Sequence, residues 1–293
     1  MAHPQRIASR SAEIGGGISV NRLLPTRLRR NVGAWCFLDH AGPATFIAGG
    51  GLRVGPHPHI GLQTFTWMLE GEVVHRDSLG NVQVIRPGQV NLMTAGHGIS
   101  HTEETLDNER QLHAAQLWIA LPPDQTDRSP GFDHYPELPA WTTQGCLFTL
   151  LAGTYGRHRA PTTVYTPLLG VDIYSAEGGA VSLELDPDFE YGILPLEGEI
   201  TFCDAQFGVN ELAYLAPGQK TLSLNLAPGT RILFLGGAPF GHEIVMWWNF
   251  VGLSREQVIR AQTDWEQGHA RFGKVEGFDG EPLVAPPLPW PQR

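Results

Sequence analysis

At 293 residues the chain exceeds the size of most single-core domains, so we expect two domains or one large two-lobed β fold. Hydrophobic residues at 42%, charged residues at 17%, 35 Gly and 23 Pro indicate a globular, turn-rich β protein and exclude a disordered one. A net charge of −10 argues against nucleic-acid or anionic-membrane binding, because phosphate groups are bound by clustered Lys and Arg.

The cysteines and the apolar segments indicate the cellular compartment of the protein. Cys36, Cys146 and Cys203 lie far apart and lack CxxC spacing, which favours a reducing compartment and excludes a thiolate zinc site. The first residues lack the continuous apolar segment of a secretory signal, and no apolar run approaches the ~20 residues of a membrane span. We therefore expect a soluble cytoplasmic protein, and we expect it to be a monomer.

Short β-type segments separated by turns follow one another along the chain. The first series comprises TFTWMLEGEVVHRD (64–77), VQVIRPGQ (82–89), VNLMTAG (90–96) and LHAAQLWIALP (112–122). The second comprises ILPLEGEITFCD (193–204), ELAYLAPGQ (211–219), KTLSLNLAPG (220–229) and TRILFLGGAP (230–239). Near the end, residues 254–273 predict a helix, with Ser254 as N-cap and Gln257 completing a capping box.

Two phrases recur between the two series. MLEGEV (68–73) matches PLEGEI (195–200), and RPGQ (86–89) matches APGQ (216–219), at offsets of 127 and 130 residues. The simplest interpretation is a duplicated β unit that reuses its tight turns. A segment rich in Pro and Asp, residues 122–141, connects the halves. We expect an N-terminal metal-binding domain, 1–140, and a C-terminal domain without ligands, 141–293, that also carries the helix.

Two motifs in the first half carry groups that bind metals. Residues i and i+2 of a strand point to the same face, so His57 and His59 of the HPH motif can enter one interior, and His101 and Glu103 of the HTE motif can enter it from a second strand. Three imidazoles and one carboxylate suit Fe, Mn, Co, Ni, Cu or Zn and not Ca or Mg. Such a set leaves two positions of an octahedron open for dioxygen or a chelating substrate.

The runs GPHPHIGLQT, LEGEVVHRDSLGN, RPGQVNLMTAGHGISHTEE and QLWIALP resemble the pirin family of the cupin superfamily, and the resemblance covers nearly the whole chain. It implies an all-β fold of two tandem cupin (jelly-roll-like) β-barrel domains with a short C-terminal helix. By motif position it implies that His57, His59, His101 and Glu103 bind one metal per chain, usually Fe(II). Some pirins cleave flavonols such as quercetin with dioxygen, whereas eukaryotic members are iron-dependent, redox-sensitive partners of transcription regulators.

Two positions depart from the related pattern. Many cupins and pirins carry a Glu four residues after the second His, where this chain has Gln63, so acid/base work falls more heavily on Glu103. The residue before GIxH is often Arg in relatives and is His97 here, a pocket-lining or an ordinary turn residue.

Other candidates have structural interpretations. His75 and His113 are expected at satisfied core or surface positions, and Glu104 is expected on the opposite face from Glu103. His40 follows a strand-like run and has no evident partner, while Phe46, Phe65 and Met93 suit a core or an apolar pocket.

Two functions follow from the resemblance and the ligand set. In the first, the protein is an iron dioxygenase that cleaves a flavonol with release of carbon monoxide, and Glu103 is the general base that accepts the 3-hydroxyl proton. In the second, the protein is a non-enzymatic iron-dependent redox sensor that binds a protein partner. A metal-free role is disfavoured, because four chelating groups in one interior would otherwise be buried polar groups that need other partners.

Overall fold

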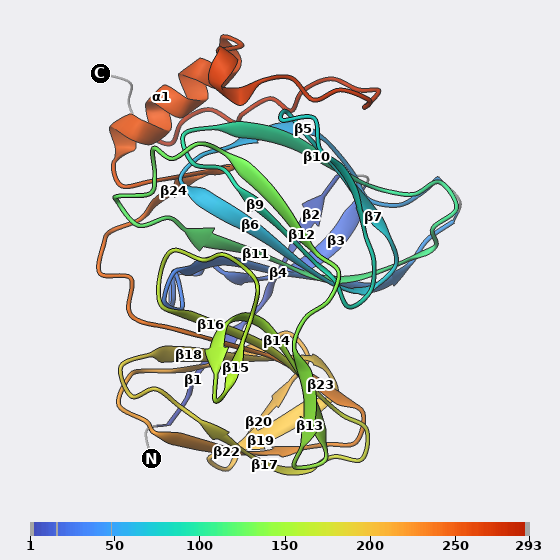
Figure 1. Cartoon of the computed structure of the whole chain (residues 1–293), viewed down its shortest axis with the longest axis vertical. Coiled ribbons are helices and arrows are strands. Elements are labelled where there is room, and N and C mark those ends of the chain that lie inside the picture. The colour runs from blue at the N-terminus through green and yellow to red at the C-terminus, as the bar shows by residue number, and fades with distance from the viewer. Residues whose placement is uncertain (1–2, 16, 48, 291–293) are drawn as a thin grey trace. The chain divides into compact units, whose positions relative to one another are not determined.

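The computed structural model describes residues 3–15, 17–47 and 49–290. The chain forms two compact units, each built mainly of β-strands (Figure 1). The histidine-bearing unit takes its residues from Glu13–Ser19, Ala41–His134 and Gly241–Arg293. The second unit takes its residues from Met1–Ala12, Val20–His40 and Tyr135–Phe240. The expected all-β fold with a short C-terminal helix is confirmed, whereas the domain ranges 1–140 and 141–293 stay a prediction.

Two sheets form the framework of the histidine-bearing unit. The larger has the order β12-β9-β6-β11-β4-β3-β2, and its last three strands contain residues of both units. The smaller has the order β5-β10-β7-β8. The strands are β2 Arg10–Ile14, β3 Ile18–Leu24, β4 Trp35–Thr45, β5 Arg53–His59, β6 Leu62–Glu70, β7 Val73–Asp77, β8 Val82–Ile85, β9 Val90–Thr94, β10 Ile99–Thr105, β11 Gln111–Ala120 and β12 Gly131–Tyr135.

The second unit also has a larger and a smaller sheet. The larger has the order β1-β21-β18-β23-β16-β14-β13, with β15 paired to β14, and the smaller has the order β17-β22-β19-β20. An apolar core from both sheets fills the space between them. The strands are β1 Gln5–Ala8, β13 Ala140–Thr143, β14 Cys146–Tyr155, β15 His158–Arg159, β16 Leu168–Ser175, β17 Gly179–Glu184, β18 Glu190–Glu197, β19 Glu199–Phe202, β20 Ala205–Gly208, β21 Glu211–Leu215, β22 Thr221–Leu226 and β23 Thr230–Gly237.

The two units repeat one strand plan, because β9-β6-β11-β4 matches β21-β18-β23-β16 and β5-β10-β7-β8 matches β17-β22-β19-β20. The LEGE turns are equivalent: Gly71 follows β6 and Gly198 follows β18, with φ of 82° and 68°. The second match is wrong, since RPGQ connects β8 to β9 whereas APGQ connects β21 to β22, the counterparts of β9 and β10. Pro-Gly pairs suit many tight turns, so this short phrase does not identify one particular turn.

Pro56 and Pro58 fit their strand because β5 is the edge of its sheet. Proline donates no backbone hydrogen bond and is therefore found mainly on edge strands. The carbonyl oxygens along this edge are used by the C-terminal segment: Pro56 accepts a hydrogen bond from Leu283 N at 2.8 Å, and Ile60 accepts one from Val251 N at 3.2 Å. The last part of the chain therefore covers the edge of the strand that carries His57 and His59.

The C-terminal segment contains the hairpin β24 Val245–Trp247 and β25 Phe250–Gly252, the helix α1 Arg255–Glu266 and the 3₁₀ helix η1 Ala270–Phe272. The Ser254 side chain accepts from Gln257 N as an N-cap should, but Gln257 Oε1 accepts from Leu253 N, so the reciprocal bond is displaced by one residue. Among the described residues, no helix is long and apolar enough to cross a membrane.

Candidate metal centre

The structure brings His57, His59 and His101 together inside the histidine-bearing unit. All three are buried, and one ligand nitrogen from each lies within 4.8 Å of the others. Among the residues that the structure describes, these three form the group that could hold a metal ion. Antiparallel pairing of β5 with β10 places His101 opposite His57 and Ile99 opposite His59. The i, i+2 spacing thus places His57 and His59 on one face, and the strand pairing places His101 on the same face.

Backbone carbonyl groups orient two of the three rings. His57 Nδ1 donates to Gly55 O at 2.8 Å, and His59 Nδ1 donates to Asn249 O at 2.9 Å. A neutral imidazole carries one proton, so both rings keep an unprotonated Nε2. Metal-ligating histidines are commonly fixed in this way, with the other ring nitrogen donating to a carbonyl or carboxylate group.

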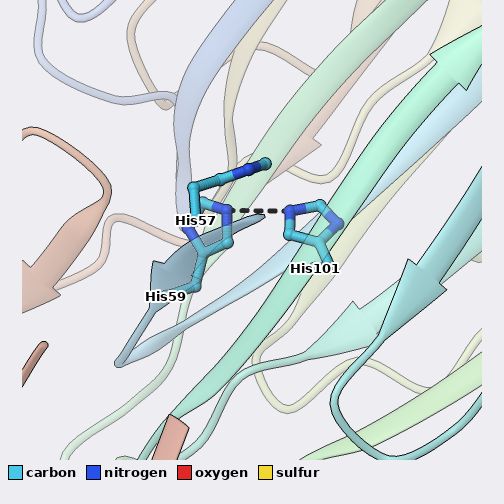
Figure 2. A group of neighbouring side chains, drawn as sticks. All are labelled: His57, His59 and His101. Carbon is cyan, nitrogen blue, oxygen red and sulfur yellow. Dashed lines mark hydrogen bonds between the residues drawn. The ribbon is translucent and has the colours of Figure 1, made fainter. Parts of the chain in front are cut away.

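The third ring completes the cluster. His59 Nε2 and His101 Nε2 lie 3.1 Å apart, as the dashed line in Figure 2 shows. A hydrogen bond from a protonated His101 Nε2, or a metal ion between the two lone pairs, would account for this separation. The distance matches the roughly 3 Å between adjacent nitrogen ligands that each lie about 2.1 Å from a metal. The three histidines therefore fit a transition-metal ion.

Electrostatics favours neutral imidazoles at this position. Burial lowers the pKa of His57 to about 4. Burial, together with the neighbouring histidines, also holds the pKa values of His59 and His101 well below the ordinary value. At neutral pH the rings are therefore uncharged and their nitrogen lone pairs are available to a cation.

Glu103 follows His101 on the same face of β10 but does not belong to the group of ligand atoms within 4.8 Å. It is partly buried, and burial raises the pKa of its carboxyl group to about 7. Its predicted role as a metal ligand stays a prediction. Gln63 lies fully buried on β6, where its amide nitrogen donates to Thr94 Oγ1 at 2.9 Å.

The other candidates lie in different surroundings. His97 is an exposed turn residue, and Glu104 forms an ion pair with Arg76. Phe65 and Met93 are core residues, while Phe46 is partly buried. In the second unit, buried His40 has Nδ1 2.6 Å from Asn210 Oδ1.

The strand pattern did not indicate that His75 contacts the cluster. His75 occupies a satisfied buried position, as expected, but its Nδ1 lies 3.3 Å from His101 Nδ1. On its other side, His75 Nε2 donates to Asp77 Oδ2 at 3.1 Å. Burial alone would raise the pKa of Asp77, but hydrogen bonds from His75 and Asn81 lower it below its ordinary value. The signal in the sequence is the HxD spacing in VVHRD, which places both side chains on one face of β7.

The second unit has leucines at the corresponding positions. Val73 and Ile200 are equivalent, because each lies two residues after the glycine of its LEGE turn. Val73 pairs with Thr105, and Ile200 pairs with Leu226. Counting back along β10 and β22 places Leu222 and Leu224 at the positions of His101 and Glu103. Leu222 pairs with Leu183, as His101 pairs with His57, and all three leucines are buried. At these positions the second unit therefore has apolar side chains in place of a histidine pair and a carboxylate.

Two repeated β units of this topology, one with three convergent imidazoles, define a two-domain cupin with a site suited to a divalent metal. The chain belongs to the pirin family: the family model described as Pirin matches residues 17–119, and the model described as Pirin C-terminal cupin domain matches residues 170–273.

Relatives and solved structures agree with this assignment. The chain is 64% identical over 286 residues to a Pseudomonas aeruginosa protein named "Putative quercetin 2,3-dioxygenase", with 98% of this chain and 91% of that protein covered. A quercetin 2,3-dioxygenase structure from Acinetobacter baumannii is 48% identical, with a TM-score of 0.97 and coverage of 99% and 97%. A bacterial pirin from Escherichia coli, solved in complex with nickel(II), shares the fold at 19% identity, with a TM-score of 0.65 and coverage of 80% and 99%.

Proposed function

We propose that this pirin is a mononuclear metal dioxygenase that cleaves flavonols such as quercetin. The convergence of three buried, uncharged imidazoles on one point is the observation that carries the proposal. The 64% identity to a protein named as a quercetin dioxygenase and the structural match at 48% identity support the substrate class. In the reaction, dioxygen is consumed, both of its oxygen atoms enter the products, and the flavonol becomes a depside and carbon monoxide.

Four side chains would bind the metal. His57, His59 and His101 would hold the metal, with Glu103 as the fourth ligand, and divalent iron is the metal we propose. When bound, this ion would supply the dioxygen chemistry that protein side chains lack. Residues around the three rings exclude water, since each ring is buried.

Glu103 is the proposed general base. Burial raises the pKa of its carboxyl group to about 7 in the metal-free protein. A divalent cation beside this group would lower the pKa, so Glu103 would be ionised and able to accept a proton. Glu103 would accept the 3-hydroxyl proton of the flavonol, so that the substrate is held as its anion. Gln63 cannot share this task, because an amide neither accepts a proton near neutrality nor carries charge.

The experiment is an aerobic quercetin assay with iron-loaded protein. We expect loss of the flavonol absorbance, with one dioxygen consumed and one carbon monoxide released per quercetin. Glu103→Gln keeps the size of the side chain and removes its charge, and we expect it to abolish turnover. Glu104→Gln is the matched control, because Glu104 is the adjacent carboxylate but pairs with Arg76, and it should remain active. Wild-type turnover no faster than that of free iron would refute the flavonol assignment.

A further inference from the structure

A buried pair of side chains on β7 lies behind His101. In the antiparallel pairing of β7 with β10, Asp77 is opposite His101 and His75 is opposite Glu103. Directly opposite residues share a face of the sheet, so all four side chains lie on the same face. His75 is 4% exposed and Asp77 is 2% exposed, which shields their contacts from competing water.

The distances connect the pair to the metal cluster in one chain of contacts. His101 Nδ1 lies 3.3 Å from His75 Nδ1, and His75 Nε2 lies 3.1 Å from Asp77 Oδ2. A stacking contact with Phe132 holds the plane of the His75 ring, with centroids 4.3 Å apart and an angle of 13° between the rings. His75 therefore has a fixed orientation between its two partners.

The chain of contacts permits one arrangement of protons when a metal occupies the site. A metal on His101 Nε2 uses that lone pair, so the proton of the neutral ring lies on Nδ1. His75 must then accept at Nδ1 and carry its own proton on Nε2, where the Asp77 carboxylate accepts it. Asp77 thus selects the tautomer of His75, and His75 selects the tautomer of His101.

The three ligand rings are oriented by different hydrogen-bond acceptors. His57 and His59 use the backbone carbonyls of Gly55 and Asn249, which no side-chain substitution removes. His101 uses a side chain that is itself oriented by a carboxylate. The orientation of the His101 ring therefore depends on two further side chains, His75 and Asp77.

We propose that His75 and Asp77 are positioning residues that fix the ring and the tautomer of His101 for metal binding. The inference rests on the metal site proposed above. It adds two residues that do not touch the metal, and it assigns them a role in metal affinity. Outer hydrogen-bond partners of this kind typically change metal affinity by 10–100-fold when they are replaced.

Asp77 also stabilises the turn between β7 and β8. The test must separate this role in the turn from the orientation of His75. Asp77 Oδ1 accepts from Leu79 N at 2.9 Å and from Asn81 N at 3.1 Å. Asp77→Asn keeps an oxygen for these turn bonds but presents an NH₂ group to His75 Nε2. His75 would then carry its proton on Nδ1, facing the Nδ1 proton that a metal requires on His101. Asn81→Ala is the control, because it removes a turn contact and leaves the His75 to Asp77 bond.

The experiment measures zinc affinity by competition with a chelator, and the positions of the histidine ring protons by ¹⁵N NMR of zinc-loaded protein. We expect Asp77→Asn to bind zinc about 10–100-fold more weakly and Asn81→Ala to bind it like the wild type. In zinc-loaded wild type, His101 should be protonated at Nδ1 alone and His75 at Nε2 alone. The NMR measurement does not depend on the folding of any variant.

Three results would overturn the inference: wild-type zinc affinity in Asp77→Asn, equal losses in both variants, or a proton on His75 Nδ1 in zinc-loaded wild type. These results leave the proposed function intact, because the metal still binds. Conversely, a protein that binds zinc with the expected tautomers but does not degrade quercetin when it is loaded with iron would refute the flavonol assignment and support the positioning role.

Discussion

His57 of β5 and His101 of β10 face each other across an antiparallel ladder, with their ring centroids 4.3 Å apart. The two rings come from motifs that are more than forty residues apart in the chain, and neither motif alone can surround an ion. The three-histidine cluster therefore depends on the pairing of these two strands.

Removal of His101 should abolish stoichiometric metal binding. We expect wild type to bind one transition-metal ion per chain and His101→Ala to bind it more than about 100-fold more weakly, beyond the usual effect of an outer hydrogen-bond partner. Native mass spectrometry and metal analysis measure both. His97→Ala is the control, since His97 is exposed in the turn just before β10. A second ion of equal affinity would contradict the assignment, because the second unit has Leu222 and Leu183 at the equivalent positions.

Gly61 is required by the turn that follows the HPH motif. It has a φ of +67°, and a Cβ at this position would lie 2.1 Å from Val251 O. We expect Gly61→Ala to lower the free energy of unfolding by about 3 kcal/mol or more, through backbone strain and the clash together. Gly80→Ala, with a φ of +88° and open space around the Cβ, should cost only about 1–2 kcal/mol. Urea denaturation of both variants makes the comparison, and equal losses would rule out the clash.

The metal-free protein should lose stability in acid. His57 has a folded pKa of about 4 against 6.5 for the free side chain, so between these values the unfolded chain binds the additional proton. Stability from this residue is therefore present above pH 6.5 and falls by about 1.4 kcal/mol per unit as the pH drops toward 4. Denaturation of chelator-treated protein at several pH values measures the slope.

Glu103 should oppose this loss. Its folded pKa of about 7 lies above the free value of 4.5, so between pH 7 and 4.5 the folded protein holds the additional proton and gains stability as the pH falls. Metal-free Glu103→Gln should therefore lose stability more steeply than wild type between pH 6.5 and 4.5. Parallel curves would show that Glu103 does not titrate in this range.

Ser254 should stabilise the start of α1. Its hydroxyl accepts from Gln257 N at 3.3 Å, and loss of such an N-cap costs about 1 kcal/mol. We expect Ser254→Ala to lose about this amount in urea denaturation, with faster amide exchange in Arg255–Glu266. Ser254→Asp can still cap the helix and should keep the wild-type value. If Ala and Asp behave alike, the cap contributes nothing.

Much of the histidine cluster could be predicted because its information is local. Side chains alternate between the two faces of a strand, so His57 and His59 share one face, and Glu103 shares the face of His101. Contacts that depend on register could not be predicted in this way. His75 reaches His101 only because β7 pairs with β10 in one particular register, and β5 changes its register against β10 between His101 and Glu103.

The C-terminal segment illustrates a second limit. Gly241–Arg293 follows the second unit in sequence but has its contacts in the histidine-bearing unit. The partner of His59 is the backbone carbonyl of Asn249, and a backbone acceptor has no residue type that a pattern could reveal.

The hydrogen bond from His59 to Asn249 spans 190 residues, and it determines when the site can be finished during translation. A nascent chain has both histidine motifs by Glu103, but the carbonyl that holds the His59 ring, and the strand that covers Ile60, are synthesised only after the whole second unit. A ribosome-bound chain that stops before residue 249 thus carries all three histidines but lacks the carbonyl group that orients the His59 ring. The last of the three rings therefore receives its hydrogen-bond acceptor late in the synthesis of the protein.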